Sequence, residues 1–91
     1  MSYSKEDVLS KARHDLARRL GVNERDVREG SVEETDFPDT SLGAGTEDEM
    51  SGQMLTRGWR IKLQANNQTY EYRADKNQVR LYNFKGNNFL L

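Results

Sequence analysis

The stretch GWRIKLQANNQTYEYRADKNQVRLY, residues 58–82, alternates apolar and polar side chains through three successive segments. A period of two residues is typical of strands that bury one face. The dipeptide Asn66-Asn67 is a hairpin signal, because asparagine tolerates the positive φ that a two-residue turn needs, and residues 75–77 turn the chain again. The sequence therefore predicts a three-stranded antiparallel meander over residues 53–82, followed by a tail over residues 83–91.

The two faces of this predicted meander differ in chemistry. The apolar face carries the aromatic and aliphatic side chains Trp59, Ile61, Leu63, Ala65, Tyr70, Tyr72, Ala74, Val79 and Leu81. The opposite face gathers the basic and aromatic side chains Arg60, Lys62, Arg73, Arg80 and Tyr82. An antiparallel sheet can leave a polar face in water, but its apolar face must be covered by another element. We therefore expect the basic face to be exposed.

The covering element is predicted to be an N-terminal helix over residues 5–20. Ser4 can cap its start, with Asp7 three residues later as the second half of a capping box. Apolar side chains recur at helical spacing, namely Val8, Leu9, Ala12, Leu16 and Leu20. Gly21 follows the last of them, where a left-handed residue ends many helices.

Between the helix and the meander, residues 27–37 indicate an irregular strand. β-branched residues favour it, and Gly30 within the pattern indicates a bulge. Pro38 ends the strand, and residues 38–52 form a long loop of small, acidic and glycine residues. The predicted fold is α+β, with the helix packed on a four-stranded, mostly antiparallel sheet made of the strand and the meander.

Length and composition limit the class of protein. The chain has 91 residues, which predicts one domain spanning residues 1–91, and it has no cysteine. Disulfides, cysteine-based metal sites and thiol nucleophiles are therefore excluded. The first residues lack the apolar core of a signal peptide, and no apolar run is long enough to span a membrane. We expect a cytoplasmic monomer that does not contact the membrane.

Charge is unevenly distributed along the chain. Residues 29–56 contain eight acidic residues and no basic residue, whereas residues 57–91 contain seven basic and two acidic residues. Such asymmetry can mark a surface for a partner. It can also reflect an acidic segment and a basic segment that neutralise each other within one fold. This second interpretation is favoured.

The residues that could carry catalysis or bind a cation are few. His14 is the one histidine, with Ser10 and Arg18 one helical turn away, and no carboxylate is evidently placed to orient its ring. We therefore predict that the protein is not an enzyme and needs no cofactor. Three consecutive acids, Glu47 to Glu49, fit no EF-hand spacing, so the hypothesis of a calcium site is weaker than that of a solvated acidic loop.

The basic sheet face raises the alternative of single-stranded nucleic-acid binding. Open sheets that bear bases and aromatic rings can bind single strands. Against this, Tyr82 is the one clear stacking ring on that face, and the isoelectric point is near 5.8. An exposed antiparallel face is polar in any case.

Three segments together resemble a known family. The segments ARHDLARRLGV (12–22), SVEETDFPDTSLGAG (31–45) and LTRGWRIKLQANNQTYEYRAD (55–75) are similar, in this order, to a widespread family of small bacterial domains of unknown function. The resemblance implies no activity, substrate or cofactor. Phe37 stands where tryptophan is usual, and Ala44 stands where many exported members carry a cysteine. The missing cysteine agrees with a reducing compartment.

The segment PDTSLG, residues 38–43, resembles the family's signature and also has a physical interpretation. Asp39 and Ser41 can form hydrogen bonds with nearby backbone, and Leu42 can be buried. A rigid corner is favoured over a contact site. The leading hypothesis is a non-enzymatic binding or regulatory module that contacts a protein partner through residues 38–52 or the basic face. The alternative is a module that binds nucleic acid through that face.

Overall fold

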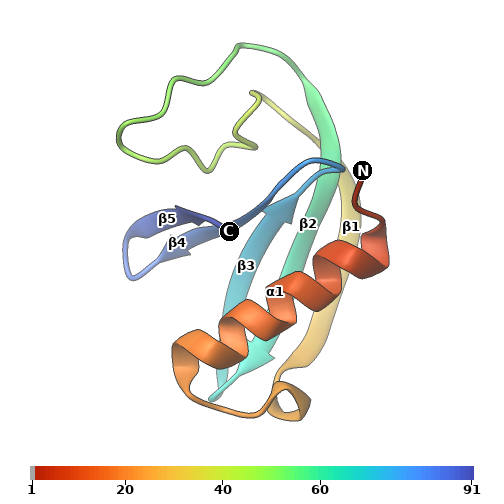
Figure 1. The fold of residues 1–91 in the computed structure, drawn as a ribbon, viewed down its shortest axis with the longest axis vertical. Helices are drawn as coiled ribbons and strands as arrows, with labels where there is room; N and C mark the ends of the chain where they lie inside the picture. The colour runs from red at the N-terminus through yellow and green to blue at the C-terminus, as the bar shows by residue number, and fades with distance from the viewer. Residues whose placement is uncertain (1) are drawn as a thin grey trace.

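An N-terminal helix lies across one face of a five-stranded antiparallel sheet (Figure 1). The computed structural model describes residues 2–91. The helix α1 is followed by a short 3-10 turn, η1, and five strands, with bounds α1 Lys5–Leu20, η1 Glu24–Asp26, β1 Arg28–Phe37, β2 Thr56–Ala65, β3 Gln68–Ala74, β4 Val79–Phe84 and β5 Asn87–Leu90. The strands lie side by side in chain order. The predicted α+β class is confirmed, with five strands instead of four.

The additional strand corrects the prediction of a tail over residues 83–91. Lys85 and Gly86 both have positive φ, 53° and 86°, and form a two-residue turn that returns the chain beside β4. The returning strand pairs Phe89 with Leu81, so the aromatic ring joins the side chains packed around the core. A segment that buries apolar surface in this way does not remain a free tail.

Both predicted ends of α1 are confirmed. The Asp7 N–H donates to Ser4 Oγ at 3.1 Å, and the Ser4 N–H donates to Asp7 Oδ2 at 2.9 Å. These two bonds form the capping box and satisfy backbone donors that the first turn leaves free. Gly21 ends the helix with φ of 69° and donates its N–H to the carbonyl of Ala17.

The predicted bulge in β1 is also confirmed. The pairing register between β1 and β2 shifts between Glu29 and Ser31, so Gly30 is the extra residue. A side chain at this position would place its Cβ 2.9 Å from the carbonyl oxygen of Lys62. Glycine therefore permits the close approach of the two strands.

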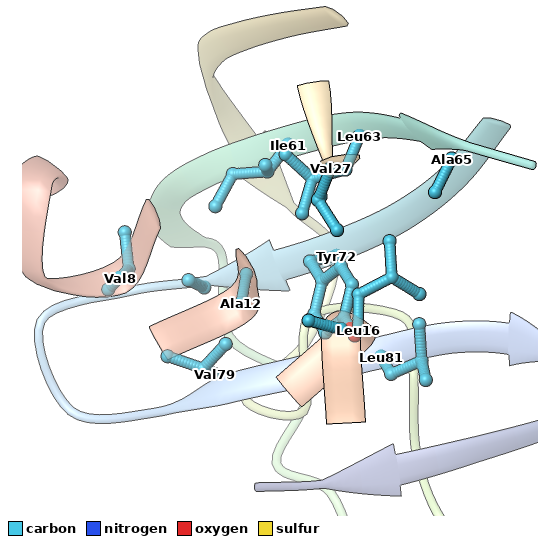
Figure 2. Packing of buried hydrophobic residues seen from close by; sticks show 12 residues of the cluster. Val8, Ala12, Leu16, Val27, Ile61, Leu63, Ala65, Tyr72, Val79 and Leu81 are labelled. Atoms are coloured by element: carbon cyan, nitrogen blue, oxygen red, sulfur yellow. The ribbon is translucent and has the colours of Figure 1, made fainter. Parts of the chain in front are cut away.

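The main core lies between α1 and the sheet (Figure 2). It contains side chains from the helix, β2, β3 and β4, chiefly Val8, Ala12, Leu16, Ile61, Leu63, Tyr72, Val79 and Leu81. Their alternation along each strand is as the sequence predicts.

No helix within residues 2–91 is long and apolar enough to cross a membrane.

One polar group is held inside this core. Asp15 on α1 is 4% exposed, and its Oδ2 accepts from the Tyr72 hydroxyl at 2.7 Å and from Arg19 Nε at 2.7 Å. Burial, and then the Asp15 carboxylate, raise the pKa of the Tyr72 phenol, so the hydroxyl remains a neutral donor. This carboxylate therefore links the helix to β3 through a directed bond in an otherwise non-directional interface.

Candidate functional site

The segment of residues 38–55, which we name the long loop, folds over the face of the sheet opposite α1. Phe37, Leu42 and Ala44 are all buried there. Arg73 donates from Nη1 to the Leu42 carbonyl at 3.0 Å, and its guanidinium lies 5.6 Å from the centre of the Phe37 ring. The outer face therefore carries a second, smaller core.

The start of the long loop is a hydrogen-bonded corner built on Asp39. Its Oδ1 accepts from the Ser41 N–H at 3.0 Å, from the Ser41 hydroxyl at 3.0 Å and from the Gly43 N–H at 2.9 Å. The Gly43 bond is the main reason that the pKa of Asp39 is lowered. Leu42 has φ of 61°, which is uncommon for a bulky residue, and its buried side chain holds it there. The backbone hydrogen bonds predicted for the Asp39 side chain and the burial of Leu42 are confirmed, whereas the Ser41 hydroxyl bonds the Asp39 carboxylate and not the backbone.

An ion pair holds the middle of the long loop on β4. Arg80 is 3% exposed, and it donates from Nη1 and Nη2 to the two carboxylate oxygens of Glu49 at 2.6 and 2.5 Å. Its Nη1 also donates to the Ala44 carbonyl at 3.2 Å, and its Nε donates to Gln78 Oε1 at 2.7 Å. The hydrogen bond from Arg80 lowers the pKa of Glu49 from 4.5 to about 2. The acidic and basic segments thus neutralise each other here, as the favoured interpretation predicts.

This arrangement corrects the expectation that the whole basic face is exposed. Arg80 is buried, and the Arg73 side chain is only 14% exposed, with its guanidinium 3.7 Å from the centre of the Tyr82 ring. Lys62 is exposed, and Arg60 is half-buried. Alternation correctly placed the five side chains on one face. The alternation gave no sign that the long loop covers part of that face.

His14 has a carboxylate partner, Glu24, that lies outside its own helix. Its Nδ1 lies 2.9 Å from Glu24 Oε2 in η1, and both side chains are exposed. Within residues 2–91 no hydrogen bond joins this ring to Ser10, so His14 and Ser10 do not form a base–nucleophile pair. The pair connects α1 to η1.

Acidic and histidine side chains do not converge on a cation site in the part of the chain that the structure describes. Of the three consecutive acids, Glu49 is engaged by Arg80, while Glu47 and Asp48 are exposed to solvent. The carboxylate oxygens that a hard cation would need are therefore not gathered around one point.

The end of the long loop is exposed and apolar. Met54 is 65% and Leu55 is 74% exposed. Together with the half-buried indole of Trp59 they line a groove of about 520 Å³, which we name the apolar groove. Its walls also include Glu34 at the β1 edge and Lys76 in the turn between β3 and β4. A concavity of this size with apolar walls and a polar rim is typical of binding sites.

A family model described as "Domain of unknown function (DUF8738)" matches residues 9–82. The chain belongs to the DUF8738 family. No curated protein and no solved structure matches the chain. The DUF8738 match contains the Asp39 corner, the long loop and every residue that lines the apolar groove. It ends within β4, so β5 lies outside the matched region.

The sequence contained one ambiguous signal for the apolar groove of this DUF8738 domain. Met54 and Leu55 precede Gly58, and the meander was predicted to begin at residue 53. In the structure β2 begins at Thr56, so both side chains lie outside the strand and are not drawn into its alternation. Met54 and Leu55 are exposed because β2 begins after them, although both side chains are apolar.

Proposed function

We propose that this DUF8738 domain is a small non-enzymatic protein-binding module and that the apolar groove is its contact surface. The observation that carries the proposal is the exposure of Met54 and Leu55 around the Trp59 ring. A side chain of this size that stays in water does not gain the roughly 1.5–3 kcal/mol of hydrophobic free energy that burial would provide. Adjacent exposed apolar side chains with a polar rim mark interaction sites on soluble domains.

The frame around the groove is fixed before any partner arrives. Trp59 lies within β2, between β1 and β3. In the turn that follows β3, the Asp75 carboxylate accepts from the Asn77 N–H at 2.7 Å, and the Lys76 carbonyl accepts from the Tyr3 N–H at 2.8 Å. A preorganised wall lowers the entropy lost on binding and therefore favours affinity.

The signature residues have a supporting role in this proposal. Asp39, Ser41 and Leu42 hold the first part of the long loop on the sheet, so that its last residues emerge beside Trp59. Nucleic-acid binding is the weaker hypothesis, because Arg80 is already neutralised by Glu49 and is shielded from solvent. The absence of cysteine suits a reducing compartment such as the cytoplasm.

Site-specific photo-crosslinking in the cell of origin tests the proposal. A photoreactive phenylalanine analogue replaces Leu55 or, as a matched control, Leu90, which is also exposed but lies in β5. The Leu55 position is expected to give a discrete protein adduct that nuclease leaves intact. Met54→Ser is expected to reduce the yield about tenfold, which corresponds to about 1.4 kcal/mol of lost apolar contact.

Met54→Ser should change the free energy of unfolding by less than about 0.5 kcal/mol, because the side chain is exposed. Equal adduct yields at Leu55 and Leu90 would contradict the groove as the contact surface. An adduct that nuclease removes would instead establish the nucleic-acid alternative.

A further inference from the structure

We infer that the partner contributes an extended, basic segment that pairs with the free edge of β1 as a sixth strand of the sheet. This inference rests on the proposed function, because it specifies the chemistry of the partner that the apolar groove receives.

The outer edge of β1 is long and open. β1 pairs with β2 along one side only, and it is the first strand in the spatial order. Its ten residues make it longer than a typical strand of about five or six residues. Within residues 2–91 no other segment forms backbone hydrogen bonds to this edge. Figure 1 shows β1 at the border of the sheet, where the first turn of α1 passes in front of it. Such an edge offers unpaired backbone donors and acceptors to another strand.

The negative charge of β1 favours a basic partner strand. Residues 28–37 contain four acids and one base, and the acids Glu29, Glu33, Glu34 and Asp36 are all exposed. Arg57 and Arg60 on β2 lie 3.3–3.9 Å from the carboxylates of Glu33, Glu34 and Asp36. These acids are exposed, so the contacts neutralise them only weakly. Like charges on facing strands are destabilising, which disfavours a second copy of this edge, whereas basic side chains are favoured.

The edge and the apolar groove are continuous at Glu34. This residue lines the groove and is also paired with Trp59 across the β1–β2 ladder. Side chains of an added strand alternate between the two faces of the sheet, so those on the α1 side lie next to the groove. Three of the acids, Glu29, Glu34 and Asp36, lie on the α1 side with Trp59, and Glu33 lies on the outer side with Arg60. A segment that carries basic residues on both faces and a large aliphatic residue beside Trp59 matches both features. Backbone pairing then supplies affinity and the groove supplies selectivity.

Amide hydrogen exchange measured by NMR on the whole domain tests the inference. The probe is a capped peptide of about eight residues, near the usual length of strands, that carries lysine or arginine on both faces of the strand and isoleucine at the position beside the groove. Alternate amides of residues 28–37 are expected to exchange at least tenfold more slowly with the peptide bound, and Met54 and Leu55 resonances are expected to shift. Two control peptides, one with the bases replaced by acids and one with a central proline, are expected to give no protection.

A charge-reversed domain supplies the second arm. The Glu33→Lys, Glu34→Lys variant should bind the basic peptide about tenfold more weakly, whereas Glu47→Lys, on the exposed part of the long loop, should bind within about twofold of the native domain. Shifts at Met54 and Leu55 without protection in β1 would overturn strand addition and leave the groove as the contact surface. No response at either place would overturn the inference, whereas the adduct yields at Leu55 and Leu90 decide the proposed function separately. Equal protection by the acidic peptide would overturn the charge argument.

Discussion

Replacing Asp15 by alanine is expected to lower the free energy of unfolding by about 3 kcal/mol. The change removes the acceptor of the Tyr72 hydroxyl and leaves that hydroxyl buried without a partner. Arg19 also loses its 2.7 Å bond to the carboxylate, although it keeps its position 4.4 Å from the centre of the Phe89 ring. A domain of this length has a total stability of roughly 5–14 kcal/mol, so the loss is a large fraction. Urea denaturation followed by tryptophan fluorescence measures it.

A double-mutant cycle shows whether the Tyr72 bond is the cause. Tyr72→Phe alone is expected to cost about 1.5–2 kcal/mol, because it removes a hydrogen bond to a charged group. In the Asp15→Ala background the same change should cost less than about 0.5 kcal/mol, because the hydroxyl no longer has an acceptor there. Asp48→Ala, an exposed loop acid, is the control and should be near neutral. Additive costs would show that the two residues are not coupled.

The Glu49→Gln variant is expected to lose about 2–3 kcal/mol, and its long loop is expected to open. Arg80 is buried, so removing the facing negative charge leaves an arginine with only neutral acceptors, the Ala44 carbonyl and the Gln78 side chain. The loss of stability cannot exceed the free energy needed to release the long loop from the sheet. Once the loop is released, water solvates the Arg80 guanidinium. Glu47→Gln makes the same change of charge two residues earlier on an exposed side chain and should cost less than about 0.5 kcal/mol.

The same variant changes the pH dependence of stability. The pKa of Glu49 is lowered to about 2 in the folded protein, against 4.5 for the unperturbed group. A lowered pKa contributes stability that is fully present above pH 4.5 and is lost as the pH falls toward 2. The native protein should therefore lose more stability than Glu49→Gln across this window. The pKa of Asp39 is also lowered, mainly by the hydrogen bond from the Gly43 N–H, so Asp39 contributes to both curves. Parallel stability curves between pH 4.5 and 2 would contradict the role of Glu49.

The helix and the meander could be predicted because their signals are local. The Ser4–Asp7 capping box, Gly21 and the alternation through residues 58–82 each depend on neighbours within a few positions. β5 was missed because its turn uses Lys85 at positive φ instead of an Asn-Gly pair, and because two asparagines begin the strand.

The covering of the outer face could not be predicted in the same way. Alternation states which face a side chain occupies, but not what lies over it. Glu49 and Arg80 are 31 residues apart, and the one available signal was the opposite charge of the two segments that contain them. The apolar groove depends on where β2 begins, and strand boundaries are the least certain part of a prediction from sequence.

The long loop is divided into a part packed on the sheet and a part left exposed beside Trp59. The chain has no cysteine, so a single thiol can report on each part. Ala44 is fully buried, whereas Met54 is exposed. The Ala44→Cys thiol is expected to react with a soluble thiol reagent about a hundredfold more slowly than the Met54→Cys thiol, and adding Glu49→Gln should remove most of that protection. Equal reaction rates for the two thiols would contradict the division of the loop and the contact surface that follows from it.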